Sequence, residues 1–217
     1  MNAFAGIFDS TNAFLEAKGI PCGQHKGAVA GPRAVEKFQA ETGIRLPGSF
    51  SEFFTGFADG FQFYWEQSED VCGGIAIPSL EEIAEEQKKW KRNVQDFLAD
   101  PHCLDRCVQP PFRAQAFEVW RRMELWVPFW DESNGDHFCV DSSSGQIVYD
   151  QHDWFDGFGS IATTNGILAG RTLEDFLRNW SRFCFASNTS LWWGEFGKFG
   201  EIRWEPEYFA EEFYRGA

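Results

Sequence analysis

The chain has 217 residues, and its 43% hydrophobic content includes 24 Phe and 10 Trp. This is enough apolar material for a sizeable core, which excludes a disordered chain. Nineteen basic and 33 acidic residues give a net charge of −14, which repels phosphate backbones and anionic lipids and argues against nucleic acid or a membrane as direct partner. The same charge favours fast encounter with basic proteins, although it also helps to keep an aromatic-rich chain in solution.

Compartment is predicted from the first residues and from the cysteines. Residues 1–19 lack a basic region followed by an apolar one, and no later stretch has the roughly 18 apolar residues of a membrane span. Six cysteines are scattered through a chain that does not need disulfide staples. These features predict a cytoplasmic protein with reduced thiols.

Apolar spacing divides the chain into a central domain and two ends. Residues 1–31 mix short apolar runs with Gly and Pro, which predicts an N-terminal extension with one weak helix over 11–18. Residues 32–186 form the predicted domain, and the aromatic residues 187–217 predict a C-terminal extension that packs on its core. Within the domain, helical spacing predicts helices over 32–42, 49–59, 79–98, 113–122 and 172–184.

Local signals refine this outline. Ser49 and Ser79 each stand three residues before a Glu, which is the spacing of a capping box at a helix start. The region over 81–122 is a predicted helical insertion. A period of two predicts strands, the last three of them an antiparallel meander, over 61–66, 125–129, 137–141 and 146–150. Helices, then sheet, then helix predict an α+β fold with a single core and a mainly antiparallel sheet flanked by helices.

Signals for catalysis, metal or cofactor are weak. His102, Cys103 and Cys107 lack the second ligand pair that a zinc site requires. His152 with Asp153, near Asp136 and His137, could form an acid–base pair, but such polar residues are also typical of turns and strand ends. No nucleophile elbow of the G-x-S-x-G kind is present. The sequence therefore predicts no enzyme, no metal and no cofactor.

Acidic residues gather over 116–160, where nine acids and two bases give a net charge of −7. Like charges on neighbouring loops repel each other, and a basic partner would relieve that cost. Tryptophans lie among them, and exposed Trp beside charge is typical of an interface hot spot. The alternative is that the tryptophans are core residues, and this is our expectation for Trp126. The predicted partner-binding residues are Asp131, Glu132, Asp136, Trp130, Asp153, Trp154 and Asp156.

Two blocks of sequence resemble the SUKH superfamily, which includes a fungal cell-wall-assembly regulator and bacterial toxin-immunity proteins. The first block is G-I-R-L-P over 43–47, followed by Phe54 and Gly60. The second is W-V-P-F over 126–129, followed by G-D at 135–136, a strand ending in Asp141, and L-E-D-F-L over 173–177. We interpret the motif residues as scaffold, namely Gly43, Leu46, Pro47, Phe54, Gly60, Trp126, Pro128, Gly135 and Asp141.

The resemblance implies an α+β domain and, for bacterial members, neutralisation of a polymorphic toxin by binding. Together with the acidic cluster it leads to the hypothesis of a non-enzymatic immunity protein whose partner is a basic toxin domain. A scaffold or regulatory protein of cell-wall or envelope assembly is the alternative from another class. A small hydrolase using His137 and His152 is a third reading.

Overall fold

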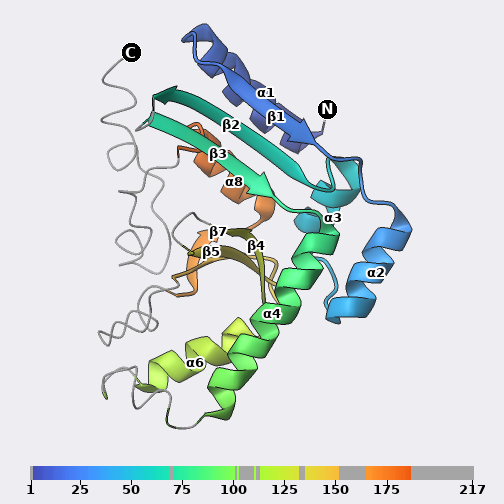
Figure 1. The fold of residues 1–217 in the computed structure, drawn as a ribbon, viewed down its shortest axis with the longest axis vertical. Helices are drawn as coiled ribbons and strands as arrows, with labels where there is room; N and C mark the ends of the chain where they lie inside the picture. Colours follow the sequence, from blue (N-terminus) through green and yellow to red (C-terminus); the bar gives the residue numbers. More distant parts are fainter. Residues whose placement is uncertain are drawn as a thin grey trace.

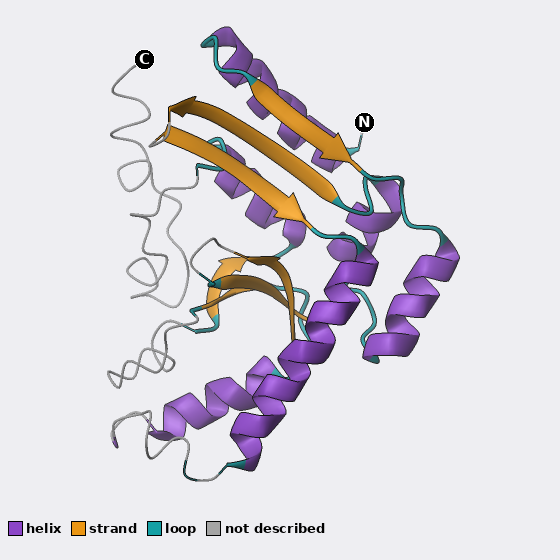
Figure 2. Cartoon of the chain, in the orientation of Figure 1, coloured by secondary structure: helices purple, strands orange, loops and turns teal. Residues whose placement is uncertain are grey.

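The computed structural model describes residues 2–68, 71–100, 102, 110, 113–131, 135–151 and 165–186. The described elements form two antiparallel sheets with helices around them, so the predicted α+β class is confirmed (Figures 1 and 2). One large apolar core contains residues of both sheets. The predicted N-terminal extension is joined more closely to this core than the sequence suggested, whereas the predicted C-terminal extension over 187–217 lies outside the described residues.

A three-stranded sheet has the order β1 (Cys22–Lys26), β2 (Phe61–Ser68), β3 (Val71–Ile77). Alternation along β2 sends Phe61, Phe63 and Trp65 into the core and leaves the residues between them exposed. α1 (Ala3–Ala17) and α8 (Leu173–Ser181) cover the inner face and lie behind the sheet in Figure 1. Among the described elements, no helix lies on the opposite face, which we call the outer face.

Helix α1 belongs to the core and is not an appendage. The Asn2 side chain accepts hydrogen bonds from the first turn and so caps the helix. Phe8 is only 1% exposed, and its ring centroid lies 4.3 Å from that of Phe61 and 5.2 Å from that of Phe185. Where we expected an extension over 1–31 with a weak helix at 11–18, the structure has a 15-residue helix and a strand paired with β2.

The second sheet is buried on both faces. It has the order β4 (Trp126–Asp131), β5 (His137–Asp141), β6 (Ile147–Asp150), β7 (Ile167–Gly170). Along β5, Phe138 and Val140 join the large core, whereas Cys139 points to the other side. This alternation explains why β5 and β6 are apolar on both sides.

The opposite face of this sheet packs on the predicted insertion. The helices are α4 (Leu80–Ala99) and α6 (Arg113–Met123), and Figure 1 shows them beside each other below the four-stranded sheet. Trp90 Nε1 donates a hydrogen bond to the Met123 carbonyl, 2.8 Å away. A second core results, comprising Trp90, Val94, Ala116, Trp120, Met123, Trp126, Cys139 and Val148. The region over 81–122 is therefore the cover of one sheet face.

Residues after α8 close the free edge of β3. Cys184 and Phe185 have φ of +54°, and Ala186 forms an isolated bridge with Gly73. The Gly74 amide donates to the Phe185 carbonyl at 2.8 Å, and Trp65 Nε1 donates to the Cys184 carbonyl at 2.5 Å. Residues 182–186 thus satisfy an edge that would otherwise be open.

Two cap predictions have different outcomes. Ser79 and Glu82 form the predicted capping box at the start of α4. The predicted box at Ser49 is wrong, because the N-cap of α3 (Gly48–Gly56) is Pro47, two residues earlier, and Ser49 lies inside the helix. Ser49 Oγ instead accepts a hydrogen bond from the Leu173 amide at 3.1 Å, which joins α3 to the start of α8. The remaining helix, α2 (Pro32–Thr42), begins with Pro as predicted.

Gln87 should be replaceable with a gain in stability. It lies on α4 with no exposed surface, and within the described chain neither side-chain amide atom has a hydrogen-bond partner. Because a buried polar group without a partner costs free energy, Gln87→Met should raise the free energy of unfolding by about 1–3 kcal/mol. Urea unfolding measures this, with Gln95→Met on the exposed face of α4 as the control. Equal effects at the two positions would contradict the argument.

Candidate protein-binding surface

The predicted face of Trp and acidic residues is not exposed at its two described side chains. Trp130 is 7% exposed, with its ring centroid 4.2 Å from that of Trp180 and 5.3 Å from that of Phe138. A register shift in β4 between Pro128 and Trp130 sends this indole into the core. Trp130 is therefore a core residue, as is Trp126, for which a core position was expected.

Asp136 is also buried, and it accepts a hydrogen bond from the Tyr149 hydroxyl. A second carboxylate lies nearby at the end of β6, where Asp150 accepts from the Asn165 side chain and lies 3.7 Å from His137 Nδ1. Each of these two buried carboxyl groups thus accepts a side-chain hydrogen bond, and the two are close enough to interact electrostatically. The expectation that Asp136 contacts a partner is corrected by this burial.

The other predicted partner-binding residues are only partly placed. Asp131 ends β4, where its backbone pairs with His137. Glu132, Asp153, Trp154 and Asp156 lie outside the described residues. Their role as a binding face stays a prediction.

Burial raises the pKa of Asp150 above its ordinary range, and nearby Asp136 raises it further, while His137 and Asn165 oppose the shift. Between the unfolded-state pKa, near 4, and the higher folded-state pKa, the folded protein holds the Asp150 proton more tightly than the unfolded chain does. The stability that comes from binding this proton is therefore lost as pH rises through the folded-state pKa. We expect Asp150→Asn to gain stability relative to the wild type between pH 4 and pH 7. Urea unfolding across this range, with exposed Asp9→Asn as control, tests this. A difference independent of pH would contradict it.

The motif residues occupy positions that shape the backbone or fill the core. Gly43 ends α2 with φ of +70°, and Gly60 and Gly135 also have positive φ. Asp141 Oδ1 accepts from the amides of Ser143 and Ser144 and fixes the turn between β5 and β6. Leu46, Phe54, Trp126 and Pro128 are buried.

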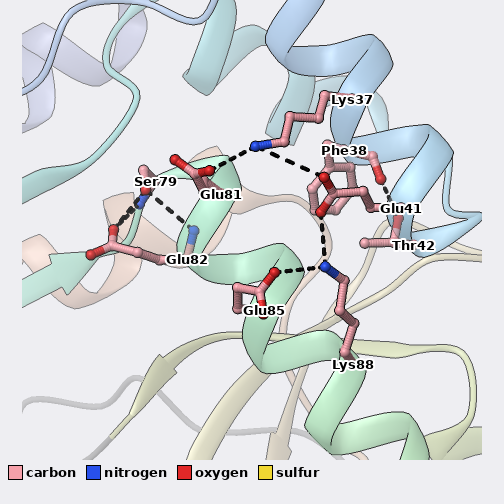
Figure 3. Close-up of polar contacts among 9 residues, drawn as sticks. All are labelled: Lys37, Phe38, Glu41, Thr42, Ser79, Glu81, Glu82, Glu85 and Lys88. Carbon is pink, nitrogen blue, oxygen red and sulfur yellow. Dashed lines mark hydrogen bonds and ion pairs between the residues drawn. The ribbon is translucent and has the colours of Figure 1, made fainter.

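The exposed start of α4 is joined to α2 by ion pairs (Figure 3). Lys37 Nζ lies 2.6 Å from Glu81, and Lys88 Nζ lies 2.9 Å from Glu41 and 2.6 Å from Glu85. Because these groups are exposed to solvent, water and salt screen the pairs, and each contributes little to stability. In these ion pairs a lysine neutralises the charge of Glu41, Glu81 and Glu85, so these carboxylates add little negative charge to the surface.

The outer face of the three-stranded sheet has a different character. Tyr64, on the central strand β2, is 61% exposed on this face. Its cross-strand neighbours are Gly23 on β1 and Gly74 on β3. The Tyr64 ring lies over Gly23, where a side chain would collide with it. The next row on this face is His25, Gln62 and Ala76. An aromatic ring with only glycine beside it is therefore presented on an open sheet face.

A depression of about 400 Å³ lies where this face meets the start of α4, and His25, Gln62, Asp59 and Glu82 are among its lining residues. Asp59 Oδ1 accepts from the Leu80 amide at 2.7 Å, and Glu82 Oε2 accepts from the Ser79 amide and hydroxyl. Hydrogen bonds from Ser79 lower the pKa of Glu82 below its usual value. The site therefore holds a carboxylate that is ionised at neutral pH.

These two surface residues, Tyr64 and Asp59, were missed as functional candidates. The signal for Tyr64 was present, because alternation over 61–66 puts Phe61, Phe63 and Trp65 on one side and Tyr64 on the other. The glycines beside it come from strands that the sequence did not predict.

Among the described residues no helix is long and apolar enough to cross a membrane, and no group of side chains has the composition of a metal site. The fold is an α+β domain in which two antiparallel sheets share a core. The chain belongs to the SMI1/KNR4 family (SUKH-1), whose family model matches residues 30–179. No individual curated protein matches the chain. Helix α1 and strand β1 precede the matched range, yet they complete the core and the three-stranded sheet.

Proposed function

We propose that the chain is a cytoplasmic, non-enzymatic immunity protein that binds and neutralises a polymorphic bacterial toxin with a basic toxin domain. The observation that supports binding most strongly is the open outer face, with Tyr64 exposed on a chain of net charge −14. Tyr is enriched at protein interfaces, and opposite potentials accelerate association. Family membership supports the general class of protein.

Affinity capture from the source cells tests this proposal. The tagged chain is used as bait at low and at moderate salt, and captured proteins are identified by mass spectrometry. We expect one stoichiometric basic protein whose association slows as salt rises, because screening weakens long-range attraction between exposed charges. Expression of this captured protein without the immunity protein should arrest the growth of a laboratory host.

Two other outcomes would count against the proposal. Capture of several envelope-synthesis proteins would favour the alternative, a scaffold or regulator of cell-wall assembly. A captured basic protein that does not harm the host would leave a binding protein without an immunity role. As a test of the non-enzymatic part, His137→Ala should retain any protection, since the proposed inhibition depends on occlusion and not on acid–base chemistry.

A further inference from the structure

We propose that the outer face of β1, β2 and β3 docks a basic protein on Tyr64, and that one Lys or Arg side chain of that protein enters the depression between Asp59 and Glu82. This inference deepens the proposed function by naming the surface used. It commits to a basic protein as the occupant because of the charge of the lining and of the whole chain.

The geometry supports a two-point contact. Tyr64 and Gln62 are neighbours on the same face, because they are two residues apart on β2, which is about 7 Å along a strand. Gln62 also lines the depression. A cationic side chain of ordinary length can therefore reach the depression from a backbone that packs on the Tyr64 ring.

Glycine leaves the Tyr64 ring uncovered by its neighbours in the same row. The ring lies over Gly23, and Gly74 on the other side has no side chain, so no side chain of β1 or β3 in this row covers the ring. In the next row of this face, the β3 residue is Ala76, whose side chain is small. An exposed aromatic ring surrounded by such small residues offers apolar contact to a partner at a small cost in conformational entropy.

The charge in the depression fits a cation. Each of its two carboxylates spends one oxygen on a backbone amide of the α4 start, Asp59 on Leu80 and Glu82 on Ser79. Among the described residues, the other oxygens, Asp59 Oδ2 and Glu82 Oε1, have no hydrogen-bond partner. The amide bonds hold the carboxylates in place, and the remaining oxygens can accept from a guanidinium or ammonium group. The lining also holds His25, whose imidazole borders the depression on the β1 side.

The test uses the whole chain and needs no toxin. The isotope-labelled protein is titrated with the peptide acetyl-Gly-Arg-Gly-amide and followed by NMR, with the neutral citrulline peptide as the matched probe. We expect saturable amide shifts at Gln62, Tyr64 and Ala76 with the arginine peptide and much smaller shifts with citrulline.

Two conservative variants remove the charges and keep the caps. Asn at position 59 and Gln at position 82 can still accept from the Leu80 and Ser79 amides, so Asp59→Asn with Glu82→Gln should fold normally. We expect this pair to weaken binding of the arginine peptide about three- to tenfold, as loss of two exposed ion pairs implies. Asp9→Asn, on the exposed side of α1 away from the outer face, is the control and should change nothing.

Shifts that scatter over the acidic surface without saturating, or an affinity unchanged in the double variant, would overturn the inference. Since the peptide titration does not depend on a toxin, it separates the two proposals. A positive titration with a failed growth test leaves a docking surface for another basic protein. A negative titration with a confirmed toxin places the contact elsewhere on the chain.

Discussion

Phe8→Ala should lower the free energy of unfolding by about 3–5 kcal/mol, a large fraction of the stability of an ordinary domain. The Phe8 ring lies among four aromatic rings, those of Phe57, Phe61, Phe63 and Phe185, at centroid distances between 4.3 and 5.9 Å. Removing it leaves a cavity where α1, β2 and the end of the domain meet. Urea unfolding followed by far-UV circular dichroism measures the loss.

Phe14 on the same helix provides the matched control. It is 38% exposed, with the Lys18 ammonium 5.0 Å from its ring centroid. Phe14→Ala makes the same change in helix propensity without removing a core ring, so a loss of less than about 1 kcal/mol is expected. Small and equal losses at both positions would show that α1 is an appendage, as the sequence first suggested.

Gly73→Ala is the second large effect, with an expected loss of about 2–4 kcal/mol. A Cβ atom at position 73 would lie 2.6 Å from both the Phe185 carbonyl oxygen and Trp65 Nε1. Neither can withdraw without cost, because the Trp65 indole donates to the Cys184 carbonyl and the Gly74 amide donates to that of Phe185. The substitution therefore forces residues 184–186 away from β3.

The opposite result is expected for a glycine without neighbours. Gly6 in α1 has no heavy atom within 4 Å of the position of a Cβ, so Gly6→Ala should stabilise the protein by about 0.5–1 kcal/mol through helix propensity. Thermal and urea unfolding of the two variants give the comparison. A Gly73→Ala protein as stable as the wild type would mean that residues 184–186 do not pack on β3.

Strong local patterns predicted the elements that carry them. The capping box at Ser79 and the helical spacing behind it gave α4, and the period of two gave β4 to β6. Strand β3 was missed because V-C-G-G-I-A-I contains two adjacent glycines, which normally weaken a strand. Gly73 is explained by the Trp65 indole and the Phe185 carbonyl, whereas a Cβ atom at Gly74 would lie 2.7 Å from the Phe63 carbonyl oxygen.

The binding site could be predicted less well than the fold. Composition drew attention to charged and aromatic residues, but it could not distinguish a buried Trp130 from an exposed Tyr64. The difference depends on a register shift in β4 and on which sheet face the helices cover. Asp59 lies beside Glu82 only because the start of α4 returns to the end of the three-stranded sheet.

Growth of a host that expresses the basic partner tests the central claim most directly. The wild-type chain should restore growth, whereas the variant that combines Tyr64→Thr, Asp59→Asn and Glu82→Gln should restore much less at the same level of folded protein. All three positions are on the surface or keep their backbone hydrogen bonds, so folding should be unaffected. Equal protection by both proteins would contradict the docking surface, and failure of the wild type to protect would contradict the immunity function itself.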